Sequence, residues 1–170
     1  SSDLAPYAEQ RIWDKKDNPA LQLMTEAVHE HGALAAIELT HSGHNSTNLF
    51  SRIPAMSPNA QAVNFLYPKQ ARRMNKKDIS DFRAWHRQAA LNAKAAGFDI
   101  VYVYAGHGMS VAQQFILPDM NNRSDEYGGS LENRLRLTRE LLEETRDAIG
   151  DSCGIAFRFA VDELKGKDGM

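Results

Sequence analysis

The stretch GFDIVYVYAGHG, residues 97–108, decides the fold. An almost continuous apolar run, Phe98 to Tyr104, follows Gly97, which ends the helical pattern before it. Such runs are typical of parallel strands that are buried on both faces. The run ends on Tyr104, and His107 follows three residues later among small residues. The stretch therefore predicts a buried strand with a phenol and an imidazole at its carboxyl end.

The same order of a helix followed by a strand occurs twice more. Gly32, Gly97 and Gly150 end three helical patterns just ahead of three apolar runs, and the predicted strands are 33–39, 98–104 and 153–159. Alternating helices and strands with short links imply right-handed crossovers and a parallel sheet.

Polar residues with a capping role precede each predicted helix. Asn18 with Pro19 at the first helical position is a favoured start for the first helix. Asn75 or Asp78 can cap the second helix, and Ser130 can cap the third. Apolar residues at helical spacing then predict the buried faces: Leu21, Met24, Ala27 and Val28; Ile79, Phe82, Trp85, Ala89 and Ala93; and Leu131, Leu135, Leu141 and Leu142.

The connections distinguish between two kinds of parallel sheet, the doubly wound sheet and the (β/α)8 barrel. Long segments, 40–75 and 105–129, follow the carboxyl ends of the strands, as expected where one face of a barrel carries the active site. A full barrel needs about 250 residues, and the chain has 170. The predicted fold class is α/β, a segment of a (β/α)8 TIM barrel with about three parallel strands and intervening helices, and residues 1–170 form one partial barrel domain.

The composition excludes several classes of protein. Apolar residues make up 42%, charged residues 25%, and the formal net charge is −2, so nucleic acid is not an expected partner. The short basic cluster Lys69–Lys77 is expected to be a solvated loop. The single cysteine, Cys153, is expected to be a small core residue. No apolar run reaches membrane-spanning length and the start SSDLAPY does not resemble a signal peptide, so a cytoplasmic protein is expected.

A tyrosine and a histidine at the end of the central strand could cooperate. Tyr104 and His107, three residues apart across a tight turn, can come within hydrogen-bond reach. Such a pair can lower the proton affinity of the phenol or move a proton. The alternative is a strand-end tyrosine at the rim beside an exposed histidine.

Charged side chains within the other two strands need partners. Arg158, between two phenylalanines, is expected to face an anionic group at the barrel mouth or to form a structural salt bridge. Glu38 needs a partner or a polar ligand for the same reason. His41 and His44 lack a carboxylate at ligand spacing, so no metal site is predicted.

The stretch NNRSDEYGGSLENRLR, residues 121–136, closely resembles the N-x-R-x-D-x-Y-G-G-S-x-E-N-R signature of the old yellow enzyme family of FMN-dependent barrels. Gly128 and Gly129 allow a sharp entry into a helix that Ser130 caps. The residues after Ser130 can bind loop backbone, and we interpret the motif as scaffold: Glu132, Asn133 and Arg134.

Within that family, the chain most resembles the trimethylamine, dimethylamine and histamine dehydrogenase branch. The matching segments are GALAAIELTHSG, FDIVYVYAGHG, the signature and the RF-x-VDE stretch from Arg158. The resemblance implies a barrel piece from the loop after strand 2 through strand 5, with FMN as cofactor. A full-length protein of this branch could also hold a [4Fe–4S] cluster, with ligands outside these residues.

The resemblance also implies roles for the strand-end residues. Alkene-reducing members typically carry His at the Tyr104 position, His or Asn at the His107 position, and a proton-donating Tyr where this chain has Met109, whose thioether cannot deliver a proton. Amine dehydrogenases of the branch use a Tyr–His pair with an Asp from a later strand. Tyr104 and His107 are thus the expected catalytic residues, and Glu38 and Arg158 the expected flavin-binding residues.

Three functions follow as hypotheses. The first is an FMN-dependent amine dehydrogenase or N-demethylase, which oxidises a secondary or tertiary, N-methylated amine to an iminium. The second is an NAD(P)H-dependent ene-reductase or 2,4-dienoyl-CoA reductase on the same fold. The third is a non-catalytic, truncated barrel segment that acts as an assembly module and pairs its sheet edges with a second copy. The expected partner is a small-molecule amine; the electron acceptor and a homo-oligomer stay open.

Overall fold

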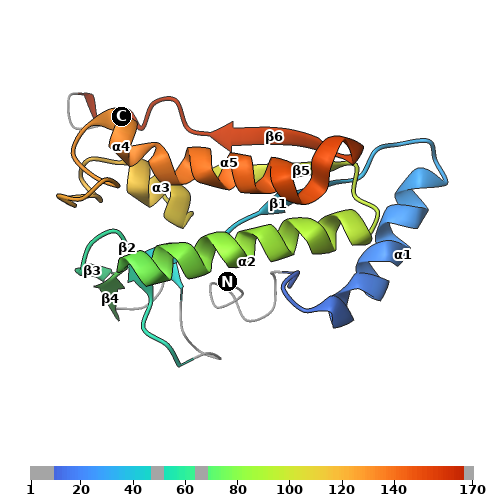
Figure 1. Ribbon diagram of the computed structural model, residues 1–170, viewed down its shortest axis with the longest axis horizontal. Helices are drawn as coiled ribbons and strands as arrows, with labels where there is room; N and C mark the ends of the chain where they lie inside the picture. Colours follow the sequence, from blue (N-terminus) through green and yellow to red (C-terminus); the bar gives the residue numbers. More distant parts are fainter. Residues whose placement is uncertain (1–9, 47–51, 64–68, 167–170) are drawn as a thin grey trace.

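A parallel sheet forms the centre of the computed structural model, which describes residues 10–46, 52–63 and 69–166. Its strands are β1 (Ala36–Leu39), β5 (Ile100–Ala105) and β6 (Gly154–Phe159), in the order β1-β5-β6 (Figure 1). All three predicted strands are therefore confirmed. Each begins one to three residues later than the apolar run alone indicates.

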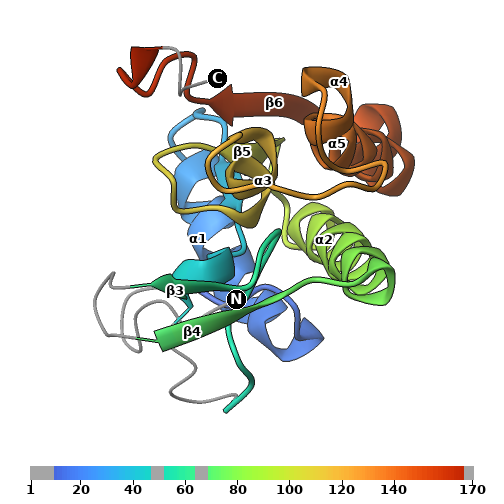
Figure 2. The ribbon, with the colours of Figure 1, turned by 90° about the vertical axis from the view of Figure 1, so that its left-hand side faces the viewer.

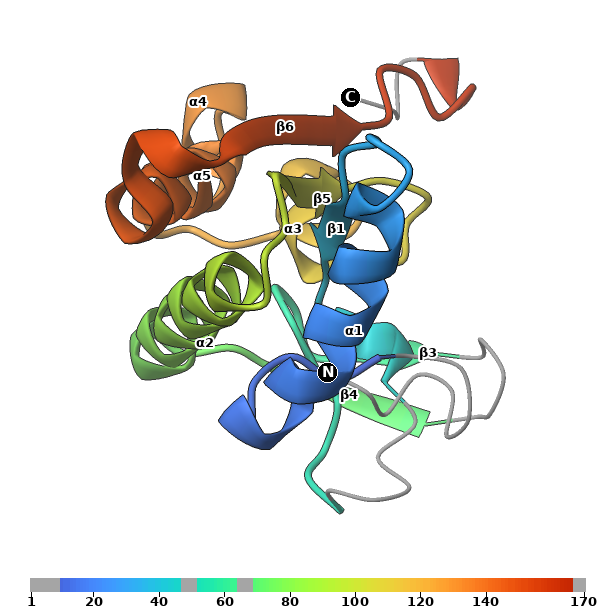
Figure 3. The ribbon, with the colours of Figure 1, turned by 90° about the vertical axis from the view of Figure 1, so that its right-hand side faces the viewer.

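Three helices connect and cover the strands. They are α1 (Asn18–His29), α2 (Lys76–Ala95) and α5 (Arg136–Ile149). Helices α2 and α5 lie side by side on one face of the sheet, as Figures 2 and 3 show from opposite ends. This alternation of helices on one face with parallel strands is a segment of a (β/α)8 barrel, as predicted.

The caps of α2 and of the third helical unit are those that the sequence predicts. The Asn75 side chain accepts from the Asp78 N–H, and the Asp78 carboxylate accepts from the Asn75 N–H, so both candidates take part in one capping box. Ser130 caps a short helix, α4 (Leu131–Arg134), which Leu135 separates from α5.

The first helix begins differently from the prediction. Asn18 is the first residue of α1 and not its cap, because a 3-10 turn, η1 (Lys15–Asp17), leads directly into the helix. Asp14 caps that turn by accepting from the Lys16 N–H.

The core lies between the sheet and its helices. Val101 and Val103 of the central strand are fully buried on the helix side. They join two apolar clusters that include residues of every covering helix: Leu21, Ile79, Phe82, Ala90, Ala93, Leu137, Leu141 and Ile149. The buried Cys153 belongs to the second cluster, as expected, and its thiol donates to the Phe98 carbonyl.

The opposite face of the sheet is only partly covered by the described residues. Glu38 and Arg158 are exposed there, and Tyr102 is half-buried. The prediction of strands buried on both faces is therefore wrong for this segment. The side chains that fill the inside of a barrel come from all of its strands, and this segment contains three of them.

Three large apolar residues of the predicted helix faces are exposed instead. Trp85, Met24 and Leu131 are each about half exposed. On α2 the buried stripe runs through His86 where the sequence pattern favoured Trp85. Adjacent positions lie about 100° apart around a helix of 3.6 residues per turn, so the stripe can take only one of the two, and the contact of His86 with Thr145 of α5 turns His86 inward.

A second small sheet occupies the segment 40–75, which was predicted to be a loop. It contains β2 (Met56–Ser57), β3 (Gln61–Val63) and β4 (Lys69–Arg73), in the order β2-β4-β3. Strand β4 pairs parallel to β2 and antiparallel to β3. A 3-10 turn, η2 (Gly43–Asn45), precedes it. Residues 47–51 and 64–68 of this segment lie outside the described residues.

The basic cluster Lys69–Lys77 is thus not a solvated loop. Its first part is β4, in which Ala71 is fully buried against Ala55 and Val63. Arg72 forms an ion pair with Asp78, with 2.7 Å between Nη1 and Oδ2. The packing of Ala71 on one face and the ion pair of Arg72 on the other stabilise this charged stretch as a strand.

The long connection 105–129 also contains a helix that the sequence pattern did not predict, α3 (Val111–Ile116). Ser110 caps it by accepting from the Gln113 N–H. Figure 1 shows α3, α4 and the small sheet gathered at the end toward which β6 points. The segments that follow the parallel strands therefore build one rim. No helix among the described residues has the length and apolar character to span a bilayer.

Candidate active site at the carboxyl end of the parallel strands

Tyr104 and His107 are in direct contact at the end of β5. The Tyr104 hydroxyl lies 2.5 Å from Nδ1 of His107, and the ring centroids are 5.9 Å apart. His107 has a φ of 57°, in the left-handed region, which turns its ring back toward the strand. The intervening Gly106 leaves room for the phenol, because a Cβ there would lie 2.9 Å from Cε2 of Tyr104.

The surroundings of Tyr104 favour the protonated phenol. Burial raises the pKa of Tyr104 above its usual value, the Glu38 carboxylate raises it further, and Arg158 opposes both. The side chain is 8% exposed. The net effect of burial and of these two charges is to keep the phenol protonated. Tyr104 is placed to donate or share a proton as a neutral group.

Glu38 and Arg158 form an ion pair above the central strand. Nη1 of Arg158 lies 3.1 Å from Oε2 of Glu38, and the guanidinium carbon lies 5.5 Å from the centroid of the Tyr104 ring. The strand register places Arg158 of β6 directly beside Tyr104 of β5. The two side chains are 53% and 33% exposed, so each has the partner that the sequence called for and still presents polar atoms to a ligand.

Tyr102 belongs to the same site, although the sequence did not single it out. In register with Glu38 on β1 and with Ala156 on β6, it shares their face of the sheet. The alternation of side chains along a strand was the available signal, because Tyr102 and Tyr104 are two residues apart. This alternation is not visible in the sequence, because the strand reads as one continuous apolar run. Glu38, Tyr102, Tyr104 and Arg158 thus form one polar surface at the sheet.

His41 and His44 lie apart from that surface. The His41 ring stacks on Trp85, with centroids 6.3 Å apart, and meets the edge of Phe82. Its Nδ1 accepts from the Gly43 N–H, and burial lowers its pKa to about 3. His44 contacts the Gln61 amide. Within the described ranges, no three His, Cys, Asp or Glu side chains gather as a metal site.

A small pocket lies behind the strands, between the sheet and helices α2 and α5. Its lining is mostly apolar and includes two histidines and the back of Tyr104: Leu39, Thr40, His41, Phe82, His86, Val103, Tyr104, Ser110, Val111, Ala112 and Leu141. His86 lies 2.9 Å from Oγ1 of Thr145, which itself donates to the Leu141 carbonyl. Nε2 of His86 is therefore the donor, and burial lowers the pKa of the ring to about 4.

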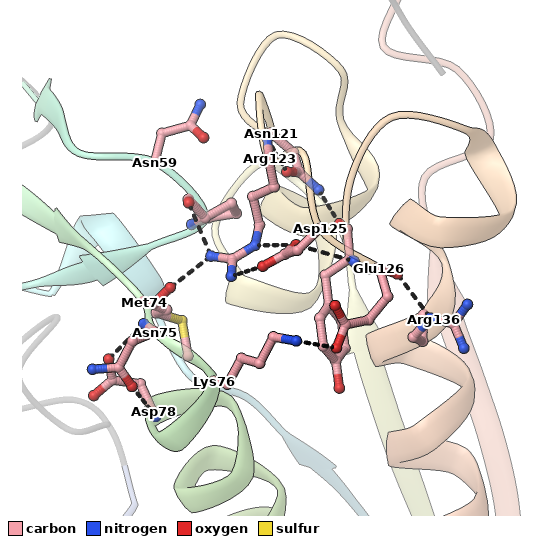
Figure 4. A network of polar contacts seen from close by, with 12 residues as sticks. Asn59, Met74, Asn75, Lys76, Asp78, Asn121, Arg123, Asp125, Glu126 and Arg136 are labelled. Atoms are coloured by element: carbon pink, nitrogen blue, oxygen red, sulfur yellow. Dashed lines mark hydrogen bonds and ion pairs between the residues drawn. The ribbon is translucent and has the colours of Figure 1, made fainter.

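The signature stretch supports this rim through a buried arginine. Arg123 is 4% exposed, and its Nη1 donates to the Met74 carbonyl at 2.6 Å and to the Pro58 carbonyl at 3.3 Å (Figure 4). Its Nε and Nη2 bind both oxygens of Asp125. One guanidinium thus joins the small sheet, the start of α2 and the loop after α3.

Neighbouring residues of the signature add further hydrogen bonds and an ion pair to this network. The Asn121 amide donates to the Phe115 and Tyr127 carbonyls, and Lys76 pairs with Glu126 at 2.8 Å (Figure 4). Gly128 passes so close to Arg123 that a Cβ would lie 2.2 Å from its carbonyl oxygen. The interpretation of the motif as scaffold agrees with these contacts.

Glu132, Asn133 and Arg134 of the signature differ in whether they bind loop backbone. Asn133 donates to the Gly128 carbonyl, and Arg134 donates to the carbonyls of Ile116 and Gly129. The prediction that Glu132 also binds loop backbone is wrong: its exposed carboxylate faces Arg139 at 3.9 Å.

Comparisons with known proteins agree with this architecture. The model of the NADH:flavin oxidoreductase / NADH oxidase family matches residues 3–170. Dimethylamine dehydrogenase of Hyphomicrobium sp. (strain x) is 35% identical over 94% of this chain and 22% of its own length.

Two solved structures superpose closely on the chain. The 6-hydroxypseudooxynicotine amine oxidase of Pseudomonas geniculata N1 has a TM-score of 0.92 at 44% identity, covering 98% of this chain and 25% of its own. Histamine dehydrogenase of Rhizobium sp. 4-9 has a TM-score of 0.91 at 41% identity, covering 97% and 24%. The chain thus spans about a quarter of the length of these relatives. It belongs to the NADH:flavin oxidoreductase / NADH oxidase family, a family of FMN-dependent oxidoreductases.

Proposed function

We propose that this chain carries part of the active site of an FMN-dependent amine dehydrogenase or N-demethylase, which oxidises a secondary or tertiary amine to an iminium. The observation that carries the proposal is the contact between Tyr104 and His107. Met109 supports it, because a thioether at that position cannot protonate an alkene carbon. The likeness to the amine-oxidising relatives supports the same choice.

The donor set on the sheet surface fits a flavin. The pyrimidine edge of a flavin presents carbonyl oxygens and an N–H group, which require hydrogen-bond donors and an acceptor. Arg158 supplies donors only and Glu38 an acceptor, and both remain accessible. We assign these two residues to binding and tuning the flavin. FMN, when bound, supplies a two-electron acceptor.

The substrate must lose a proton before it loses hydride. An alkylammonium has no lone pair on nitrogen to support the developing iminium, so the neutral amine is the reactive species. Tyr104 and His107 form one hydrogen-bonded unit that can accept and pass on this proton. A buried neutral phenol can also hydrogen-bond the amine nitrogen and orient it. The iminium carbon then adds water, which releases an aldehyde and the shortened amine.

The test is the visible spectrum of the full-length, FMN-loaded protein under anaerobic conditions. Bleaching of the flavin band by dimethylamine or trimethylamine would support the proposal. Tyr104→Phe should then slow the bleaching by roughly 10²- to 10⁴-fold, the usual contribution of a positioned proton-transfer group. Arg158→Lys is the companion variant for the flavin assignment, and it should weaken FMN retention while Tyr104→Phe should not.

A reductase is the second candidate, because the family is described as NADH:flavin oxidoreductases. A flavin that NAD(P)H bleaches and amines do not would move the assignment to that chemistry. A protein of residues 1–170 alone that stays colourless with added FMN would favour the assembly module, in which the edges of β1 and β6 pair with a second copy.

A further inference from the structure

Two consecutive glutamines of α3 hold the peptide that follows His107. Oε1 of Gln113 accepts from the Gly108 N–H. Nε2 of Gln114 donates to the Ser42 carbonyl at 3.2 Å and lies 3.4 Å from the Gly108 carbonyl. The same Gly108 carbonyl accepts from Nδ2 of Asn45 at 3.1 Å. Both polar groups of Gly108 are therefore bound by side chains.

These amides are built into the rim. Gln113 and Gln114 are 1% and 0% exposed, and a buried amide is unfavourable unless it is hydrogen-bonded. Oε1 of Gln114 also accepts from the His44 N–H at 3.1 Å. A Cβ on Gly43 would lie 2.2 Å from that oxygen, so the chain passes around the Gln114 amide at a position that only glycine allows.

Gln113 also reaches the segment after the third parallel strand. Its Nε2 donates to Oε1 of Glu163 at 3.2 Å. Gln113 therefore joins the loop after β5 to the loop after β6, while Gln114 and Asn45 join it to the loop after β1. All three links meet at Gly108.

The residue before Gly108 is His107, whose left-handed φ of 57° is unfavourable for a residue with a Cβ. Gly108 itself has a φ of 64°. A free loop would relax toward right-handed or extended conformations, which would take Nδ1 of His107 away from Tyr104. We propose that Gln113 and Gln114 are positioning residues, which hold His107 in this conformation and so keep its ring on the Tyr104 hydroxyl. Only the kinetic consequence rests on the proposed function.

The test uses the full-length, FMN-loaded protein with 3-fluorotyrosine at position 104, observed by fluorine NMR. His107→Gln gives the reference shift for a phenol that has lost its imidazole. Gln113→Leu should move the resonance in the same direction, because the Gly108 N–H loses its acceptor. The matched control is Ser110→Ala, which removes the cap of the same helix and leaves both amides, and it should leave the resonance in place.

A second test swaps the amide of Gln113 and the carboxylate of Glu163. Gln113→Glu keeps an acceptor for the Gly108 N–H and sets two carboxylates against each other, so the resonance should shift or broaden. The double variant Gln113→Glu/Glu163→Gln again has a donor and an acceptor, and it should return the resonance toward its original position. This pair decides the question even where Gln113→Leu does not fold.

The kinetic expectation is a loss in rate rather than in binding. Gln113→Leu should lower the limiting rate of flavin reduction by amine roughly 10- to 100-fold, as a displaced group near the chemistry does, with little change in amine affinity. An unchanged fluorine resonance in Gln113→Leu, where His107→Gln moves it, would overturn the positioning proposal. A shifted resonance in a protein that amines do not reduce would support positioning and reject the proposed reaction.

Discussion

Arg158 of β6 and Glu38 of β1 reach each other across the central strand, with 3.1 Å between Nη1 and Oε2. The Arg158 guanidinium lies over the Tyr104 ring, and the two charges of the pair act on the phenol in opposite directions. The acidity of Tyr104 is therefore balanced by residues from the two flanking strands.

Removal of either charge should shift the ionisation of Tyr104 in a predictable direction. Glu38→Gln removes the anion that disfavours the phenolate, so the pKa of Tyr104 should fall. Arg158→Gln removes the cation that favours the phenolate, so the pKa should rise. Ultraviolet difference titration, with Tyr104→Phe subtracted to isolate this residue, measures both. Shifts of the same sign in both variants would contradict the assigned electrostatics.

Gly106 should be intolerant of a side chain because of Tyr104. In Gly106→Ala the new Cβ would lie 2.9 Å from Cε2 of the phenol, so the ring must move away from His107. Flavin reduction by amine should slow by roughly 10- to 100-fold. Gly154→Ala on β6 is the control, since its Cβ would make only an ordinary contact of 3.5 Å with Ile100. Equal rates in the two variants would argue against the importance of the Tyr104 position.

Arg123 should be a major source of stability. Replacement by Leu leaves Asp125 without its cation and leaves the Met74 and Pro58 carbonyls without a donor. Because Asp125 is partly exposed, the unpaired acceptors should cost about 1–3 kcal/mol of unfolding free energy, measurable by urea denaturation. Lys76→Ala, which breaks the exposed pair with Glu126, should change the midpoint far less. A small effect of Arg123→Leu would show that the scaffold does not depend on it.

His86 should make the protein sensitive to acid. Its pKa in the fold is about 4, below the unfolded value of 6.5, so the unfolded chain binds the proton first. Stability is complete above pH 6.5 and falls as the pH drops toward 4, by about 3 kcal/mol over that interval. His86→Leu should flatten this part of the curve of urea midpoint against pH. The exposed His31 provides the control variant, His31→Gln.

His41 also contributes to the dependence of the urea midpoint on pH. Burial lowers its pKa to about 3, so it adds its own acid sensitivity and the His86→Leu curve should retain a slope. A His86→Leu curve that superposes on that of the unmodified protein would contradict the buried, neutral state of His86.

The sequence predicted the parallel strands well, because their signals are local. Continuous apolar runs bounded by Gly32, Gly97 and Gly150 need no knowledge of the rest of the molecule. The capping box of Asn75 and Asp78 and the cap at Ser130 are likewise confined to a few neighbouring residues. The contact of Tyr104 with His107 spans three residues, and it was one of the two alternatives that the spacing left open.

The small sheet was not predictable in this way. Strand β4 carries three cations in five residues and therefore resembles a solvated segment, and it becomes a strand because Ala71 packs on Ala55 and Val63. Its strands are too short, and too polar, to give a periodic pattern. The inward position of His86 in place of Trp85 depends in the same way on a neighbour, α5, that is distant in the sequence.

The sequence by itself determined the class of fold, the scaffold role of residues 121–136 and the strand-end residues from which a site could be built. These follow from apolar periodicity, caps and glycines, whose effects act within one or two turns of chain. Only the tertiary structure decided that Glu38 pairs with Arg158 over Tyr104 and that Gln113 and Gln114 hold the peptide after His107. Those contacts join residues up to 120 positions apart, and hydrogen bonds and ion pairs depend on distances that only the packed sheet and helices fix.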